Sequence, residues 1–152
     1  MAIGRFGIAA DRIILYGQSI GTVPTVDLAS RELCAGVVLH SPLASGLRVI
    51  RPSTTCNLWC DPFPSIKKIG RVRSPVLFIH GEQDDIIPVS HSRQLMDRCS
   101  TTVDPLFLPT AGHNDVEFHE EYLTSLSSFL STLSLMNPQT SMSTHATLTV
   151  AL

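Results

Sequence analysis

The sequence predicts an α/β fold in which a mostly parallel sheet is flanked by helices. Two observations predict it: apolar residues gather in short continuous runs, and helical segments lie between those runs. Continuous rather than alternating apolar runs are typical of parallel strands buried on both faces. Strands that alternate with helices favour a sheet with right-handed crossovers. A chain of 152 residues with 43% hydrophobic residues can form one domain with a substantial core.

Four apolar runs are the predicted strands, the fourth weaker than the others. They cover residues 12–16, 36–40, 75–80 and 105–108. Three helices are predicted, at residues 22–33, 90–99 and 115–135. The last of these carries apolar side chains at helical spacing, and Asp115 and Glu117 suit its positively polarised N-terminal end.

Two segments are predicted to lie outside the core. Residues 51–63 combine prolines with Cys56, Cys60 and the only tryptophan, which is typical of a loop or cap. From Asn137 onward the chain is rich in serine and threonine and has no Asp, Glu, Lys or Arg. We therefore expect residues 1–135 to form the domain and residues 136–152 to form a disordered tail.

The composition argues against several classes of protein. A net charge of −2 offers no basic surface for nucleic acid. No apolar run reaches the ~18 residues of a membrane-spanning helix. The apolar stretch at the N-terminus is too short for a secretory signal, so we expect a cytoplasmic protein with reduced cysteines. Only Cys56 and Cys60 lie close together in the sequence, and no second ligand pair matches them. We therefore predict neither a metal site nor a cofactor.

A candidate nucleophile lies between the first predicted strand and the first predicted helix. Gly17, Gln18, Ser19, Ile20 and Gly21 match G-x-S-x-G, and in this context the motif forms a sharp turn that exposes its serine. The two glycines lack a Cβ, so the strand and the helix can approach closely around Ser19. The backbone N–H of Ile20 is the natural oxyanion donor because it lies at the start of a helix. The alternative is a tight turn with a chance serine.

A candidate acid and a candidate base follow later strands. Asp84 and Asp85 come just after the third strand, and His113 follows the fourth strand on a glycine-flanked loop. The carboxyl ends of parallel strands share one edge of the sheet, so these side chains should converge on Ser19. The order Ser, Asp, His is that of α/β-hydrolases. The usual H-G-x-x-D spacing favours Asp84 over Asp85, and His80 is expected to be packed or hydrogen-bonded.

These three residues predict acyl transfer. His113 takes the proton of Ser19 as the hydroxyl attacks an acyl carbonyl, while Asp84 holds the imidazole tautomer and stabilises its charged form. Water activated by the same histidine then releases the acyl group. The triad does not by itself choose between an ester, a thioester and an amide.

The motifs around these residues resemble the alpha/beta-hydrolase-domain-17 family. Residues 17–31 are similar to the nucleophile turn and following helix of that family. Further matches occur in the same order at residues 38–43, 74–77, 80–81 and 112–115. The resemblance extends from about Arg5 to about Leu135. It implies the C-terminal part of an α/β-hydrolase fold.

The resemblance also implies an activity. It makes Ser19, Asp84 and His113 the catalytic triad of a palmitoyl-protein thioesterase whose partners are S-acylated protein substrates. Full-length members of the family are associated with the cytoplasmic face of plasma and endosomal membranes.

The chain departs from the family pattern in three ways. It starts just ahead of the nucleophile strand, so the preceding strands and the loop that supplies the other oxyanion N–H are expected to be missing. The first strand is then expected to have an exposed apolar edge. The lipidated N-terminal cysteine cluster of the family is absent, so no membrane anchor is evident. The residues after Met136 match nothing in the family.

Three functional hypotheses follow. The first is a serine hydrolase that cleaves the thioester of S-palmitoyl-cysteine. The second is another carboxylester or acyl hydrolase, or an oligopeptidase-like enzyme, on the same scaffold. The third is a non-catalytic truncated fragment.

Overall fold

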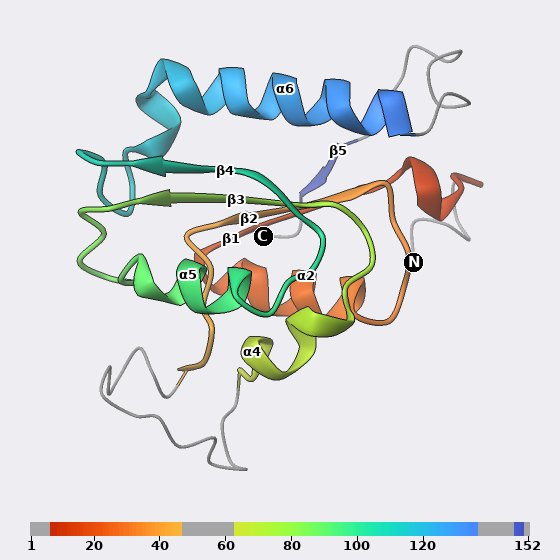
Figure 1. The fold of residues 1–152 in the computed structure, drawn as a ribbon, viewed down its shortest axis with the longest axis horizontal. Coiled ribbons are helices and arrows are strands. Elements are labelled where there is room, and N and C mark those ends of the chain that lie inside the picture. The colour runs from red at the N-terminus through yellow and green to blue at the C-terminus, as the bar shows by residue number, and fades with distance from the viewer. Residues whose placement is uncertain (1–6, 47–62, 137–147, 151–152) are drawn as a thin grey trace.

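A parallel sheet forms the centre of the molecule (Figure 1). The computed structural model describes residues 7–46, 63–136 and 148–150. Within them the sheet has the strand order β4-β3-β2-β1-β5, and every neighbouring pair is parallel. The strands are β1 (Ile14–Gln18), β2 (Gly36–His40), β3 (Val76–Gly81), β4 (Thr102–Leu108) and β5 (Leu148–Val150). The predicted α/β class with a mostly parallel sheet is confirmed.

The central strands explain the continuous apolar runs in the sequence. Every residue of β2 and of β3 is buried. Both faces of these strands contact helices, so neither face needs polar side chains. β4 lies at the edge of the sheet and starts at Thr102, before the run predicted at 105–108. Its pairing with β3 shifts register around Pro105, a residue with no N–H to donate, and such an irregularity is tolerated at an edge.

The helices cover the two faces of the sheet unequally (Figure 1). The helices α2 (Thr22–Ala29), α4 (Ser65–Lys68) and α5 (Ser90–Met96) lie on one face, and α6 (Glu120–Met136) lies on the other. Short 3₁₀ turns occur at Ala10–Arg12, Ser19–Gly21, Ile69–Arg71 and Val116–Phe118. Two apolar cores result. Val26, Ile69 and Leu95 belong to the first, and Phe129 and Leu133 belong to the second.

The last helix begins later than the sequence predicts. Val116–Phe118 forms a 3₁₀ turn, and His119 has extended backbone angles (φ −85, ψ 137), which prevent one continuous helix from residue 115. Glu120 and Glu121 therefore occupy the first turn of α6. The assignment of Asp115 to the N-terminal end of that helix is wrong. Its Oδ1 instead accepts a hydrogen bond from the Gly112 N–H at 2.6 Å.

The C-terminal residues differ in part from the expected disordered tail. Leu148–Val150 forms a short strand that pairs in parallel with residues Ile14–Tyr16 of β1. The edge of β1 that was expected to be exposed is thus covered over three residues by a segment containing β-branched residues. Residues 137–147 and 151–152 lie outside the described residues, and so do most of the loop predicted at 51–63 and its cysteines. The described helices include none that is long and apolar enough to cross a membrane.

Candidate active site

Ser19 lies at a sharp turn between β1 and α2. Its backbone φ is +51°, a left-handed conformation that a non-glycine residue adopts only under strain. A Cβ at Gly17 would overlap Thr25 Oγ1 and lie 2.7 Å from the Gly21 carbonyl oxygen. The close approach of strand and helix predicted from the two glycines is therefore present at Gly17. Gln18 precedes the turn in extended conformation, and Gly21 ends it in helical conformation.

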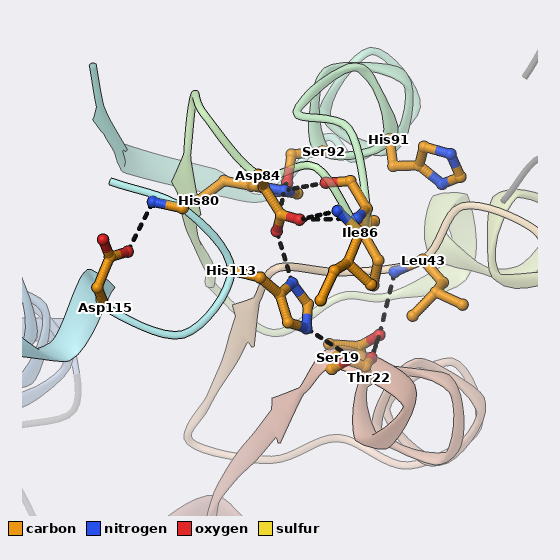
Figure 2. Close-up of polar contacts among 12 residues, drawn as sticks. Ser19, Thr22, Leu43, His80, Asp84, Ile86, His91, Ser92, His113 and Asp115 are labelled. Carbon is orange, nitrogen blue, oxygen red and sulfur yellow. Dashed lines mark hydrogen bonds and ion pairs between the residues drawn. The ribbon is translucent and has the colours of Figure 1, made fainter. Parts of the chain in front are cut away.

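Thr22 holds this turn in place through hydrogen bonds of its side chain, a role that the sequence pattern did not predict. Its hydroxyl donates to the Ser19 carbonyl oxygen at 2.6 Å and accepts from the Leu43 N–H at 3.3 Å (Figure 2). The Thr22 side chain is buried. One hydroxyl thus joins the serine turn to the segment that follows β2.

His113 faces Ser19 from the loop after β4 (Figure 2). Its Nε2 lies 3.1 Å from Ser19 Oγ. The loop is held in two ways: Asp115 binds the Gly112 N–H, and Gly81 at the end of β3 packs directly against the backbone of residues 111–112. A Cβ at Gly81 would overlap the Ala111 and Gly112 carbonyl oxygens. The strand end and the histidine loop can meet only because Gly81 has no side chain.

Asp84 completes a continuous chain of hydrogen bonds. Its Oδ2 lies 2.7 Å from His113 Nδ1, and its Oδ1 accepts from the N–H groups of Ile86 and Ile87 at 3.0 and 2.7 Å. The side chain of Asp84 is buried, whereas Asp85 is exposed. Of the two carboxylates that the sequence offered, Asp84 is the one that contacts His113.

The carboxylate of Asp84 is held in its ionised form. Burial opposes ionisation, but hydrogen bonds from His80, from the Ile87 N–H and from His113 outweigh it. Together they lower the pKa of Asp84 well below its usual range. An ionised carboxylate at this point can orient His113 and stabilise its protonated form.

Ile20 follows Ser19 directly and lies in the 3₁₀ turn that leads into α2. N–H groups in the first turn of a helix have no partner within the helix, so the Ile20 N–H can serve an oxyanion. The side chain of Ile20 is 53% exposed, and that of Ile86 on the Asp84 loop is 51% exposed. Both apolar residues are therefore open to solvent, Ile20 directly after Ser19 in sequence and Ile86 two residues after Asp84.

A second polar network lies on the α6 side of the sheet, and no sequence pattern predicted it. Tyr16 OH lies 2.9 Å from His40 Nδ1 and 2.9 Å from Tyr122 OH. Burial, followed by the charges of His80 and His113, lowers the pKa of His40 to about 4. Burial and the hydrogen bond with Tyr122 raise the pKa of Tyr16. Among the described side chains, His40 Nε2 and the hydroxyl of Ser41 are buried without a partner.

No grouping of three or more His, Cys, Asp or Glu side chains suited to a metal ion occurs in the described part of the chain. Cys34 and Cys99 are buried and unpaired. Cys56 and Cys60 lie outside the described residues.

Sequence comparison identifies proteins similar to this chain. No protein-family model matches the chain. The chain is 58% identical over 126 residues to the alpha/beta hydrolase domain-containing protein aho-3 of Caenorhabditis elegans. It is 56% identical over 127 residues to the human alpha/beta hydrolase domain-containing protein 17C and 52% identical over 127 residues to the human protein 17B. These relatives, which match the chain at high identity, are members of the alpha/beta hydrolase domain-containing protein 17 family.

These matches cover most of this chain but less than half of each relative. They cover 83%, 84% and 84% of this chain, but only 38%, 39% and 44% of the respective relatives. The chain thus spans about two fifths of the length of these family members.

Solved structures agree on the fold. A monoacylglycerol lipase of Paleococcus ferrophilus superposes with a TM-score of 0.65 at 20% identity, over 87% of this chain and 72% of the lipase. An esterase of Pyrococcus furiosus gives a TM-score of 0.65 at 17% identity, over 86% of this chain and 57% of the esterase. At these identities the likeness establishes the α/β-hydrolase architecture of the described residues.

Proposed function

We propose that this chain carries the catalytic residues of a serine hydrolase. The observation that supports the proposal most strongly is the hydrogen-bonded sequence Ser19 Oγ–His113 Nε2, His113 Nδ1–Asp84 Oδ2, at 3.1 and 2.7 Å. The three side chains come from three different loops at the carboxyl edge of the sheet. A strained serine hydrogen-bonded to a loop histidine, which is in turn hydrogen-bonded to a buried carboxylate, is the arrangement that activates a serine hydroxyl.

In the proposed reaction Ser19 Oγ attacks the acyl carbonyl carbon while His113 Nε2 takes the hydroxyl proton. The tetrahedral oxyanion accepts a hydrogen bond from the Ile20 N–H. The bond to the leaving group then breaks, and His113 gives its proton to the departing atom. Water attacks the acyl-serine ester and its proton passes to His113. His113 then gives this proton to the departing Ser19 Oγ, and the carboxylic acid and the free serine are released.

The finer proposal is that the substrate is the thioester of S-palmitoyl-cysteine in a protein. It rests on the family resemblance, and two exposed apolar residues, Ile20 in the serine turn and Ile86 in the Asp84 loop, suit an acyl chain. The leaving group is then a cysteine thiol, and the partners are S-acylated proteins at the cytoplasmic face of a membrane. We propose no metal, cofactor or nucleic acid in this reaction.

A fluorophosphonate probe tests the coarse proposal. The probe reacts with activated serines, so we expect it to label the wild-type chain and to leave Ser19→Ala at background. Ser134→Ala is a matched control, because Ser134 is an exposed residue of α6 whose hydroxyl bonds only within its helix. Absence of Ser19-dependent labelling favours the non-catalytic fragment.

Three matched peptides test the finer proposal. Each carries one palmitoyl group, attached through a cysteine thioester, a serine oxyester or a lysine amide. We expect Ser19-dependent release of palmitate from the thioester. Release from the oxyester or amide alone, with the thioester intact, would instead support the carboxylester hydrolase or the oligopeptidase-like enzyme.

A further inference from the structure

We infer that His80 is a positioning residue for the catalytic carboxylate, with Ser92 satisfying the other ring nitrogen of the tautomer in which it acts. This inference rests on the proposed function, because it concerns the same Asp84. His80 is the penultimate residue of a completely buried strand, and it is fully excluded from solvent. Figure 2 shows it on the opposite side of Asp84 from His113.

Both ring nitrogens of His80 have partners. Nδ1 lies 2.7 Å from Ser92 Oγ on α5. Nε2 lies 2.8 Å from the Ile87 carbonyl oxygen and 3.2 Å from Asp84 Oδ2. The imidazole therefore joins β3, α5 and the loop that carries Asp84.

The partners determine where the ring proton lies. A carbonyl oxygen and an ionised carboxylate only accept hydrogen bonds, so Nε2 must carry a proton and donate it. In the neutral ring Nδ1 is then an acceptor, and the Ser92 hydroxyl is a donor that can satisfy it. The Ile87 carbonyl and Asp84 thus select this tautomer, and Ser92 supplies the donor that its Nδ1 needs.

The N–H group of His80 faces Oδ2, the same oxygen of Asp84 that contacts His113. Oδ1 of Asp84 is held by the N–H groups of Ile86 and Ile87, and Oδ2 is shared between His113 and His80. The carboxylate is therefore held at both oxygens. The bond from Nε2 to the Ile87 carbonyl also closes the loop back onto the strand. Without His80, one end of the loop and one side of Oδ2 lose their support.

The charge state of Asp84 agrees with this role. Among the hydrogen bonds that counter the effect of burial on its pKa, the bond from His80 is the largest. A partner that orients a general-base histidine through a carboxylate affects rate strongly, because a displacement of about 1 Å near the reacting groups can reduce rate about 10²-fold.

Two substitutions separate positioning from packing. In His80→Gln the amide nitrogen takes approximately the place of Nε2 and keeps a donor toward Asp84. In His80→Asn the amide reaches only the place of Nδ1, so that donor is lost. Both variants are polar and smaller than histidine. His91→Asn is the control, because His91 is the buried neighbour of Ser92, and its Nδ1 accepts from the Ala44 N–H rather than from the triad.

The first measurement is the rate of fluorophosphonate labelling of Ser19, divided by the folded fraction from circular dichroism. We expect His80→Asn to be about 10- to 100-fold slower than the wild type, and His80→Gln and His91→Asn to remain within about 3-fold. Equal rates in His80→Asn and the wild type would overturn the inference. Equal losses in His80→Asn and His80→Gln would assign His80 a packing role only.

The second measurement does not require activity. ¹⁵N NMR of the imidazoles reports whether His113 keeps its proton on Nδ1, facing Asp84. We expect one tautomer in the wild type and in His80→Gln, and a mixture in His80→Asn. An unlabelled wild type would refute the proposed function, yet an unchanged His113 tautomer in His80→Asn would separately refute the positioning role.

Ser92 provides a milder test that does not depend on His80 variants folding. Ser92→Ala removes the donor to Nδ1, and Ser92→Thr keeps a hydroxyl. We expect labelling to slow about 3- to 10-fold in Ser92→Ala and to be restored in Ser92→Thr, because the alanine variant leaves Nδ1 of His80 buried without a donor. Labelling at the wild-type rate in Ser92→Ala would contradict the role assigned to Ser92.

Discussion

His40 and His80 lie at the ends of neighbouring strands, and their environments differ sharply. The side chains are 1% and 0% exposed. Both ring nitrogens of His80 are hydrogen-bonded, and one contacts the carboxylate that orients His113. Among the described residues His40 is bonded through Nδ1 only, and it faces the tyrosines beneath α6. Equal burial thus serves two purposes: His80 supports the candidate catalytic groups, whereas His40 belongs to the packing between sheet and helix.

His40 is followed in sequence by a residue with a strained backbone. Ser41 has a φ of +46°, and its hydroxyl, like His40 Nε2, has no partner among the described residues. A buried polar atom without a hydrogen bond typically destabilises the folded state by about 1–3 kcal/mol. We therefore expect the free energy of unfolding to depend on the protonation of His40 at the end of β2. We expect the reactivity of Ser19 to depend instead on the geometry of the groups at the end of β3.

The largest expected effect concerns Asp84, the carboxylate that follows β3. In Asp84→Asn the amide keeps the size of the carboxylate but favours the wrong His113 tautomer and removes the negative charge. We expect the labelling rate of Ser19 to fall on the order of 10⁴-fold. The control is Asp85→Asn, because Asp85 is exposed and adjacent. If the two variants label equally fast, Asp84 is not the acid of the site.

The next effect tests the β2 side through pH. Burial lowers the pKa of His40 from 6.5 to about 4, so between these values the unfolded chain binds a proton that the folded chain does not. The free energy of unfolding should therefore fall as pH drops from 6.5 to 4, by about 3 kcal/mol, and this contribution should level off below pH 4.

Urea denaturation of the wild type and of His40→Asn measures this contribution by difference. Asparagine cannot take up the proton, and its side-chain oxygen can still accept from Tyr16. The lowered pKa of Asp84 acts in a separate window, because the stability it contributes is present above about 3.8 and is lost only as pH falls further. If the free energy of unfolding depends on pH in the same way in both proteins, His40 does not take up a proton preferentially in the unfolded chain.

A smaller effect tests the contact between β3 and the His113 loop. In Gly81→Ala the new methyl group meets the carbonyl oxygens of Ala111 and Gly112, which are backbone atoms with little freedom to move. We expect the free energy of unfolding to fall by about 1–3 kcal/mol. Gly70→Ala is the matched control, because its methyl group would lie 3.2 Å from a single carbonyl oxygen. Equal losses at the two glycines would remove the special role of Gly81.

The sequence predicted the parts of this molecule that depend on local pattern. Continuous apolar runs identified β1, β2 and β3 to within about two residues, because burial on both faces leaves a clear signature. Ser19, Asp84 and His113 could be chosen because each follows its own strand and parallel strands end at one edge. The structure brings these three side chains together at hydrogen-bonding distance.

Features that depend on distant partners could not be predicted in the same way. His80 was placed at a strand end, but its link to Asp84 depends on Ser92 from another helix. Tyr16 and Tyr122 are 106 residues apart in sequence. The late start of α6 depends on the extended backbone of His119, which helical periodicity does not reveal. Local pattern therefore located the reactive groups, and tertiary packing determined what holds them.

The smallest expected effect asks whether the two histidine environments are independent. Tyr122→Phe removes one hydroxyl and leaves Tyr16 bonded to His40, so we expect a loss of about 1 kcal/mol in the free energy of unfolding. Tyr16→Phe removes both hydrogen bonds and should be more destabilising. Per folded molecule, both variants should label Ser19 within about 3-fold of the wild-type rate, because neither hydroxyl contacts the triad. A larger change in labelling would mean that the network beneath α6 also positions His113, and the separation of the two environments would fail.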